Sequence, residues 1–199
     1  MFSAGLLTYM LFFLSVQEIS GQAEPTTQLE FQLRDVNGQL RTEKEWKDSK
    51  FVVLFFMDTE CPVSKLYVPE MNRIAEKYSK QQVVFYGIIS DPEASAKHIR
   101  KHAKEYKFTF PVLLDPAQTF AQHTRAKRVP EAALLNNRGE LFYGGRIDDW
   151  YLLNGRRRRE PRKRDLREAL DAVIAGKQPR VQRTKAFGCP LPALPGQSK

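Results

Sequence analysis

Two spacings of apolar residues alternate along this chain and predict alternating strands and helices. Residues 51–57, 82–89 and 131–135 are short and almost unbroken apolar runs, which are typical of strands buried on both faces. Residues 63–80 instead carry apolar side chains at helical spacing and predict an amphipathic helix. Because helices connect the strands, we expect the central strands to be parallel.

Further elements are predicted on both sides of this central region. The segment Ser90-Asp91-Pro92 predicts a helix that begins at Pro92, is capped by Ser90 or Asp91, and reaches about Tyr106. An alternating pattern at 29–33 predicts a half-buried strand before the central sheet. The remaining predictions are a helical turn at 43–47 with Trp46 turned inward, an extended segment at 110–114, a short helix at 115–123, a hairpin strand at 141–143 and a last helix at 164–175.

The first central strand leads almost directly to a cysteine, Cys61, which Pro62 follows. Proline is well tolerated in the first turn of a helix, so we expect the helix to begin here. A cysteine at this position faces unpaired backbone N–H groups and the positive end of the helix dipole, and both favour the thiolate. Cys61 is therefore the candidate nucleophile, and a buried structural cysteine is the alternative.

This corner, together with Val129-Pro130 before the strand at 131–135, resembles the active site of the thioredoxin-like superfamily. The resemblance is to its redoxin branch of alkyl hydroperoxide reductase and thiol-specific antioxidant-like proteins. It implies an α/β, three-layer thioredoxin-like fold: a central mixed sheet flanked by helices, with an extra N-terminal strand and a C-terminal tail. It also implies a cis Pro130 that presents the Val129 backbone to an extended substrate chain; the alternative is an ordinary edge-strand proline.

Two departures from the family patterns limit the chemistry. Ser64 stands where dithiol oxidoreductases of the superfamily have their second cysteine. Its hydroxyl can donate to a thiolate, but any redox cycle needs another thiol: Cys189, a small thiol or a partner protein. The peroxiredoxin pattern Pro-x-x-x-Thr/Ser-x-x-Cys would place its hydroxyl residue at Asp58, so Thr59 is one position out of register, although it could still point at the thiolate.

Other candidate residues are open to two interpretations each. Cys189 is the second of only two cysteines and can pair with Cys61 if the fold brings them within bridging distance. Arg146 either lowers the pKa of the Cys61 thiol or pairs with Asp148 or Asp149. His98 and His102 are four residues apart on one helix face, but they lack a third ligand nearby, so we expect a solvated face, no metal and no cofactor.

The N-terminal segment predicts that the protein is exported. Residues 1–23 contain an apolar segment followed by small residues and predict a signal peptide, which leaves no integral membrane span. We expect a redoxin domain at 24–176 and an extended tail at 177–199.

The formal charge of +9 comes largely from the basic cluster at 156–164. This cluster is either a solvated loop or a site for a polyanion. No nucleic-acid partner is expected, because the cluster lacks interleaved aromatic residues.

Taken together, the sequence predicts an exported, periplasmic or secreted, redox protein. It would act as a thiol–disulfide oxidoreductase or thiol-dependent peroxidase through Cys61, on a thiol or disulfide protein, a small thiol or a peroxide, with an external reductant. The alternative is a noncatalytic binding module with a structural Cys61–Cys189 disulfide. A metal-delivery protein is a third option, disfavoured because paired cysteines and a distant histidine ligand are not evident.

Overall fold

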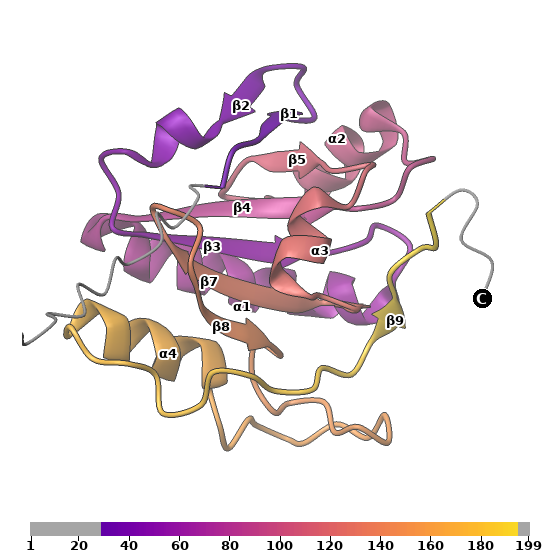
Figure 1. Cartoon of the computed structure of the whole chain (residues 1–199). Coiled ribbons are helices and arrows are strands. Elements are labelled where there is room, and N and C mark those ends of the chain that lie inside the picture. The colour runs from indigo at the N-terminus through magenta and orange to yellow at the C-terminus, as the bar shows by residue number, and fades with distance from the viewer. Residues whose placement is uncertain (1–28, 195–199) are drawn as a thin grey trace, which may run out of the picture.

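The computed structural model describes residues 29–194, and its main sheet has five strands. They are Phe51–Phe56 (β3), Val83–Ile89 (β4), Val112–Leu114 (β5), Glu131–Asn136 (β7) and Leu141–Gly145 (β8). Their order across the sheet is β5-β4-β3-β7-β8 (Figure 1). β3, β4 and β5 are mutually parallel, and β7 is antiparallel to both β3 and β8. The expected mixed sheet is confirmed. β3 and β4 are parallel as predicted, whereas the predicted strand at 131–135, β7, is antiparallel to β3.

Helices cover both faces of this sheet and make a three-layer α/β fold. They are Pro62–Tyr78 (α1), Ala96–Glu105 (α2), Thr119–Thr124 (α3) and Asp165–Ile174 (α4), with 3-10 turns at Glu43–Trp46 (η1) and Ser79–Gln81 (η2). None of the helices within residues 29–194 has the length and apolar character needed to cross a bilayer.

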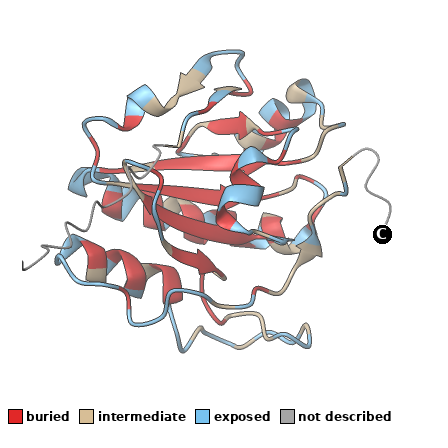
Figure 2. Cartoon of the chain, viewed as in Figure 1, coloured by how far each residue is buried: buried red, intermediate tan, exposed pale blue. Residues whose placement is uncertain are grey.

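Strand β3 is central because its alternate side chains enter two separate cores. Val53 and Phe55 pack in a core shared with α1, α2 and α4, whereas Leu54 and Phe56 pack with Trp46 of η1 and with α3. Figure 2 shows the strands of the main sheet as almost wholly buried. A strand buried on both faces has to be apolar throughout, which explains the unbroken run seen in the sequence.

The N-terminal part differs from a simple extra strand of the main sheet. Gln32–Arg34 (β1) and Leu40–Thr42 (β2) form their own antiparallel hairpin. The hairpin is joined to the edge of β5 by a hydrogen bond from the Val36 N–H to the Val112 carbonyl, at 2.9 Å. Trp46 is fully buried beyond this hairpin, as predicted.

The predicted start of the second helix is wrong. Helix α2 begins at Ala96, and the hydroxyl of Ser95 caps it by accepting the His98 N–H at 3.4 Å. The Asp91 carboxylate instead accepts the N–H of Glu93 at 2.9 Å and closes a local turn. Both Ser90-Asp91-Pro92 and Ser95 satisfy the capping pattern, and the sequence offers no local signal for choosing between them.

The tail after α4 returns across the molecule to the carboxyl end of β3 (Figure 1). It runs beside β8, where the Gly144 N–H donates to Gln182 and the Thr184 N–H donates to the Gly144 carbonyl, at 2.9 and 3.1 Å. It then forms a two-residue strand, Cys189–Pro190 (β9), antiparallel to Arg128–Val129 (β6). The tail is therefore held by backbone pairing at two places.

Candidate active site

Cys61 occupies the N-cap position of α1, with Pro62 as the first helical residue. Its backbone is extended, and its carbonyl accepts the first helical hydrogen bond, from the Lys65 N–H at 3.2 Å. A side chain at an N-cap normally accepts hydrogen bonds from the free N–H groups of the first turn. No acidic residue lies in that turn. A Cys61 thiolate would therefore meet favourable dipoles and no opposing carboxylate from the first turn of the helix.

Cys61 is joined by a disulfide to Cys189, with 6.1 Å between the Cα atoms. Cys189 lies in β9 directly opposite Val129 of β6. The Val129–Pro130 peptide bond is cis, as the resemblance implied, and the Cys61 sulfur lies 3.5 Å from the Val129 carbonyl oxygen. The chain's own tail thus occupies the backbone edge that the resemblance assigned to an extended substrate.

The tail is anchored on both sides of Cys189. The Phe187 ring stacks on Tyr151, with 5.4 Å between ring centroids. After the cysteine, the Leu191 N–H donates to the Lys127 carbonyl at 3.0 Å. Between these anchors, the Arg128 guanidinium donates to the Gly188 carbonyl at 2.8 Å. Leu191 also packs against the core cluster that contains Cys61, so the tail is held next to the disulfide.

Ser64 and Thr59 lie buried on either side of Cys61 along the chain. Ser64 is 1% exposed, and its hydroxyl has no hydrogen-bond partner among residues 29–194. It sits within the first turn of α1, on the same helix terminus as Cys61. Thr59 is 9% exposed in the loop that leads from β3. Both residues are placed in the predicted neighbourhood, and their roles stay predictions.

Arg146 pairs with neither of the two carboxylates predicted for it, Asp148 and Asp149. Its guanidinium pairs with Asp165 at the start of α4, with Nε 2.8 Å from Oδ2, and this hydrogen bond raises the Arg146 pKa. Asp148 is unavailable to it because that carboxylate is buried and accepts a hydrogen bond from the Tyr67 hydroxyl at 2.7 Å. The Arg146 guanidinium is therefore held at the start of α4, and its effect on the pKa of Cys61 stays a prediction.

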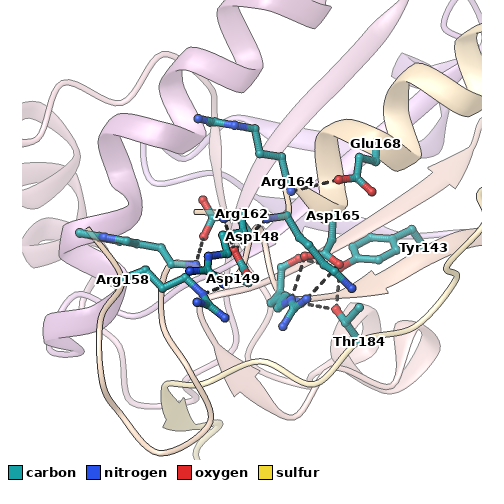
Figure 3. Close-up of polar contacts among 12 residues, drawn as sticks. Tyr143, Asp148, Asp149, Arg158, Arg162, Arg164, Asp165, Glu168 and Thr184 are labelled. Atoms are coloured by element: carbon teal, nitrogen blue, oxygen red, sulfur yellow. Dashed lines mark hydrogen bonds and ion pairs between the residues drawn. The ribbon is translucent and has the colours of Figure 1, made fainter. Parts of the chain in front are cut away.

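The other predicted partner of Arg146, Asp149, is bound by the basic loop (Figure 3). Its carboxylate pairs with Arg158 at 3.1 Å and accepts the N–H groups of Arg162 and Lys163 at 2.6 and 2.9 Å. The Arg157 guanidinium lies 5.6 Å from the Trp150 ring centroid. Part of the basic cluster is therefore structural.

A second polar group, also drawn in Figure 3, ties the tail to β8. The Tyr143 hydroxyl lies 2.6 Å from both the Thr184 hydroxyl and the Arg146 carbonyl, and the Thr184 hydroxyl accepts the Arg146 N–H at 3.0 Å. These three bonds are mutually consistent when Tyr143 donates to the carbonyl and Thr184 donates to Tyr143. Burial raises the Tyr143 pKa, so its hydroxyl remains a donor.

The two histidines of α2 lie in different environments. His98 is exposed and lies 3.1 Å from the Glu60 carboxylate. His102 is buried, and its ring stacks on Tyr106 with 4.3 Å between centroids; burial lowers its pKa. The expected solvated face is therefore wrong for His102. Residues 29–194 contain no group of three or more His, Cys, Asp or Glu side chains placed to hold a metal ion.

Sequence reasoning missed two residues that receive the tail, Arg128 and Tyr143, and it missed Asp165 as the partner of Arg146. Arg128 meets Gly188 across 60 residues, and Tyr143 meets Thr184 across 41. Arg146 and Asp165 are 19 residues apart. No local pattern links partners at such separations, so only the tertiary packing brings them together.

Comparison with known proteins agrees with this geometry. The thioredoxin-like protein YneN of Bacillus subtilis is 27% identical over 134 residues, which are 67% of this chain and 74% of that protein. A thiol-disulfide oxidoreductase, ResA of Halalkalibacterium halodurans, is 25% identical over 112 residues, which are 56% of this chain and 61% of ResA. The crystal structure of a hypothetical protein from Sinorhizobium meliloti 1021 is 29% identical, with a TM-score of 0.72, and the match covers 83% of this chain and 91% of the other.

The thioredoxin-like fold that the sequence resemblance implied is confirmed by YneN and by solved structures of a putative thiol:disulfide interchange protein from Chlorobium tepidum and a putative thioredoxin from Neisseria meningitidis, each with a TM-score of 0.51. The match to a family model is more specific than either the fold or the pairwise identities. The model of the AhpC/TSA family matches residues 25–143, more than half of the chain, and includes the Cys61 corner and the cis proline. The chain therefore belongs to the AhpC/TSA family.

Proposed function

We propose that this protein is a thiol–disulfide oxidoreductase in which Cys61 is the nucleophile and Cys189 the resolving cysteine. One observation carries the proposal: a cysteine at the N-terminus of α1 is joined to a cysteine on a docked tail strand. Relatives named as a thioredoxin-like protein and as a thiol-disulfide oxidoreductase support the oxidoreductase class.

The proposed cycle uses two thiols of this chain. In the reduced protein, the Cys61 thiolate attacks a substrate disulfide, forms a mixed disulfide and releases one substrate thiolate. The Cys189 thiolate then attacks the Cys61 sulfur, the second substrate thiolate leaves, and the Cys61–Cys189 bond forms. Two electrons pass from the protein to the substrate, so an external thiol must restore the reduced form.

The surrounding residues would favour the first step. The free N–H groups of α1 and the Ser64 hydroxyl can stabilise the Cys61 thiolate, and Thr59 is a further neighbour. With the tail released, the Val129 backbone before Pro130 offers an edge to which an extended substrate chain can pair. Because Asp58 stands where the peroxiredoxin pattern requires Ser or Thr, disulfide exchange is preferred here over peroxide reduction.

Trapping the mixed disulfide tests the division of labour between the two cysteines. With a model disulfide substrate, reduced Cys189→Ser should accumulate a substrate adduct on Cys61, because the resolving thiol is missing. Cys61→Ser should accumulate none and should lack disulfide reductase activity. Mass spectrometry of the acid-quenched mixtures reads both results. An adduct that forms equally on Cys189 in the absence of Cys61 would reject Cys61 as the specific nucleophile.

The rival function is a binding module with a permanent disulfide. A structural bridge should have a reduction potential below about −300 mV, and a working one should lie above it. Equilibration of the purified protein with glutathione or dithiothreitol redox buffers measures this potential. A value well below that limit, with no turnover of any disulfide, would favour the binding module.

The domain limits and the destination of the protein are part of the same proposal. Residues 1–23 would be removed as a signal peptide, and the redoxin domain at 24–176 would keep its tail at 177–199. Residues 1–28 lie outside the described residues. Disulfides persist in oxidising compartments, which supports export to a periplasm or the exterior. N-terminal sequencing of protein recovered from an exporting host should begin at Glu24.

A further inference from the structure

We propose that a basic cavity beside the Cys61–Cys189 disulfide binds a small thiol that carries carboxylates, and that this thiol reduces the disulfide by attacking Cys189. The inference rests on the proposed function and names the chemical class of its electron donor. The cavity is formed in part by the tail, and its side chains have no role in the attack of Cys61 on a substrate disulfide.

The cavity has a volume of about 630 Å³ and lies between the tail and the segment before β7. This volume falls within the range of about 300–1,000 Å³ that is usual for sites of small molecules. Its apolar wall includes Phe187 and the side chain of Leu153, which is 61% exposed. Its charged lining consists of five cationic residues and one carboxylate: Arg125, Lys127, Arg128, Arg183, Lys185 and Glu131.

The lining keeps an excess of positive charge, because a single carboxylate stands among its five cations. Within residues 29–194, none of the five cations forms an ion pair with a carboxylate. The only acid of the lining, Glu131, is engaged by the backbone, since its Oε2 accepts the N–H groups of Lys127 and Arg128 at 2.6 and 2.9 Å. A concave site with a large excess of one sign of charge concentrates ions of the opposite sign, and guanidinium groups match carboxylates in geometry.

The cavity adjoins the disulfide through two of its lining residues. Phe187 precedes Cys189 by two residues, which is about 7 Å along an extended chain. Arg128 pairs with Pro190 in the β6–β9 ladder. Cys189 is partly exposed, whereas Cys61 is 2% exposed, so a thiol held here is expected to attack Cys189. Attack on Cys189 also expels Cys61 as a thiolate at a helix N-terminus, and a stabilised thiolate leaves faster.

The proposed step balances with two molecules of the small thiol. The first thiolate attacks the Cys189 sulfur, forms a mixed disulfide with Cys189 and releases the Cys61 thiolate. A second thiolate attacks the sulfur of the bound small molecule, which releases Cys189 as a thiolate and yields the symmetric small-molecule disulfide. The protein gains two electrons, and the small thiol supplies both.

Reduction rates with thiols of different charge test the site. We would compare 3-mercaptopropionate, 2-mercaptoethanol and cysteamine on the oxidised full chain, with each rate expressed per thiolate. At low salt the anionic thiol should react about tenfold or more faster than the cationic one, and added salt should reduce the difference. In the double variant Lys127→Gln/Lys185→Gln, the ratio of the rate with 3-mercaptopropionate to the rate with cysteamine should fall several-fold. Lys101→Gln/Lys104→Gln, which removes the same charge from the exposed face of α2, should keep it.

Two further measurements separate this inference from the proposed function. S-methylglutathione, which has carboxylates but no free thiol, should bind the oxidised protein, and the cavity variant should bind it several-fold more weakly than the α2 variant. Peptide mapping after an acid quench should find the small-thiol adduct on Cys189. Equal rates for the three thiols, no binding of S-methylglutathione, or an adduct on Cys61 would each overturn the inference. If dithiothreitol reduces the disulfide and the protein then turns over a disulfide substrate, the proposed function stands even though the inference fails. If no thiol reduces the disulfide, the proposed function itself is rejected.

Discussion

At the scale of single residues, the buried hydroxyl of Ser64 is an uncompensated polar group in the oxidised protein. It is 1% exposed and has no hydrogen-bond partner among the described residues. A buried polar group without a partner destabilises a fold by about 1–3 kcal/mol. A reduced Cys61 would offer a charged acceptor at the same helix terminus. We therefore expect Ser64 to stabilise the Cys61 thiolate relative to the disulfide.

Ser64→Ala should slow the reaction of Cys61 with an alkylating agent at neutral pH. The lost hydroxyl removes a donor to the thiolate, so the midpoint of the alkylation rate against pH should rise. The oxidised protein should keep its stability or gain slightly, since the unpartnered group is gone. Ser79→Ala, at the other end of α1, is the control. An unchanged midpoint would show that Ser64 does not contact the thiolate.

Asp115 should make stability fall as the pH rises from about 4 to 6. Its carboxylate is buried while accepting the N–H groups of Thr119 and Phe120 at 2.8 and 3.0 Å. Burial raises its pKa to about 6, above the unfolded value of about 3.9. The folded state therefore holds the proton more tightly than the unfolded state, and protonation in this window stabilises the fold by an amount on the order of 2 kcal/mol.

Urea unfolding of Asp115→Asn across this pH range checks the prediction. The amide keeps one acceptor oxygen but does not titrate, so the difference between wild type and variant should change between pH 4 and 6. The exposed Glu76→Gln should leave that dependence unchanged. Parallel curves for wild type and Asp115→Asn would mean that Asp115 has an ordinary pKa in the fold.

At the scale of elements, docking of β9 depends on a close approach between two backbones. Gly188 has φ of +156°, and a Cβ there would collide with the Val129 carbonyl and lie 3.1 Å from Pro130. The two-residue ladder of β9 with β6 is too short to be stable alone, so it relies on this fit and on the stacking of Phe187.

Gly188→Ala should therefore hinder formation of the Cys61–Cys189 disulfide. The added methyl group pushes the tail away from Val129, so a larger share of free thiols should remain at a given redox potential. Thiol titration in glutathione buffers measures that share. Gly176→Ala is a matched control, because Gly176 also has a positive φ, of +72°, but has no atom within 4 Å of the added Cβ. Equal thiol content in the two variants would contradict the docking geometry.

At the scale of the whole molecule, the disulfide links the start of α1 to a tail strand 128 residues later. In the chain-entropy treatment, a loop of this length stabilises the folded state by about 5 kcal/mol, although measured values are often smaller. The reduced protein should therefore remain folded around its two cores but unfold at lower urea concentration. The tail should be the first part to gain freedom.

Urea unfolding of wild type with and without reductant measures this difference. Cys189→Ser should resemble the reduced wild type and should not respond to reductant. Hydrogen exchange should show faster exchange at residues 177–194 in both, with little change in β3 and β4. Identical unfolding midpoints for oxidised and reduced wild type would show that the disulfide contributes nothing to global stability.

The sequence by itself determined the main strands and helices of the central region and the position of the candidate nucleophile. The run through β3 is apolar because both of its faces are buried, and Pro62 marks the start of α1 because its missing N–H is harmless there. Cys61 lies between these two signals, and the pattern of strands and helices implied the mixed sheet around them. These features could be read locally, since each depends on neighbours within one turn or one strand.

Only the tertiary structure decided which distant groups meet. Arg146 could have paired with nearby Asp148, but the Tyr67 hydroxyl takes that carboxylate and leaves Asp165 as its partner. Helix α2 is capped by Ser95 and begins at Ala96, because Asp91 closes a local turn instead. The tail is held by contacts of Thr184 and Phe187 and by backbone pairing with Val129. Such contacts join residues tens of positions apart, and their choice depends on how the elements pack, which a local pattern of residues does not record.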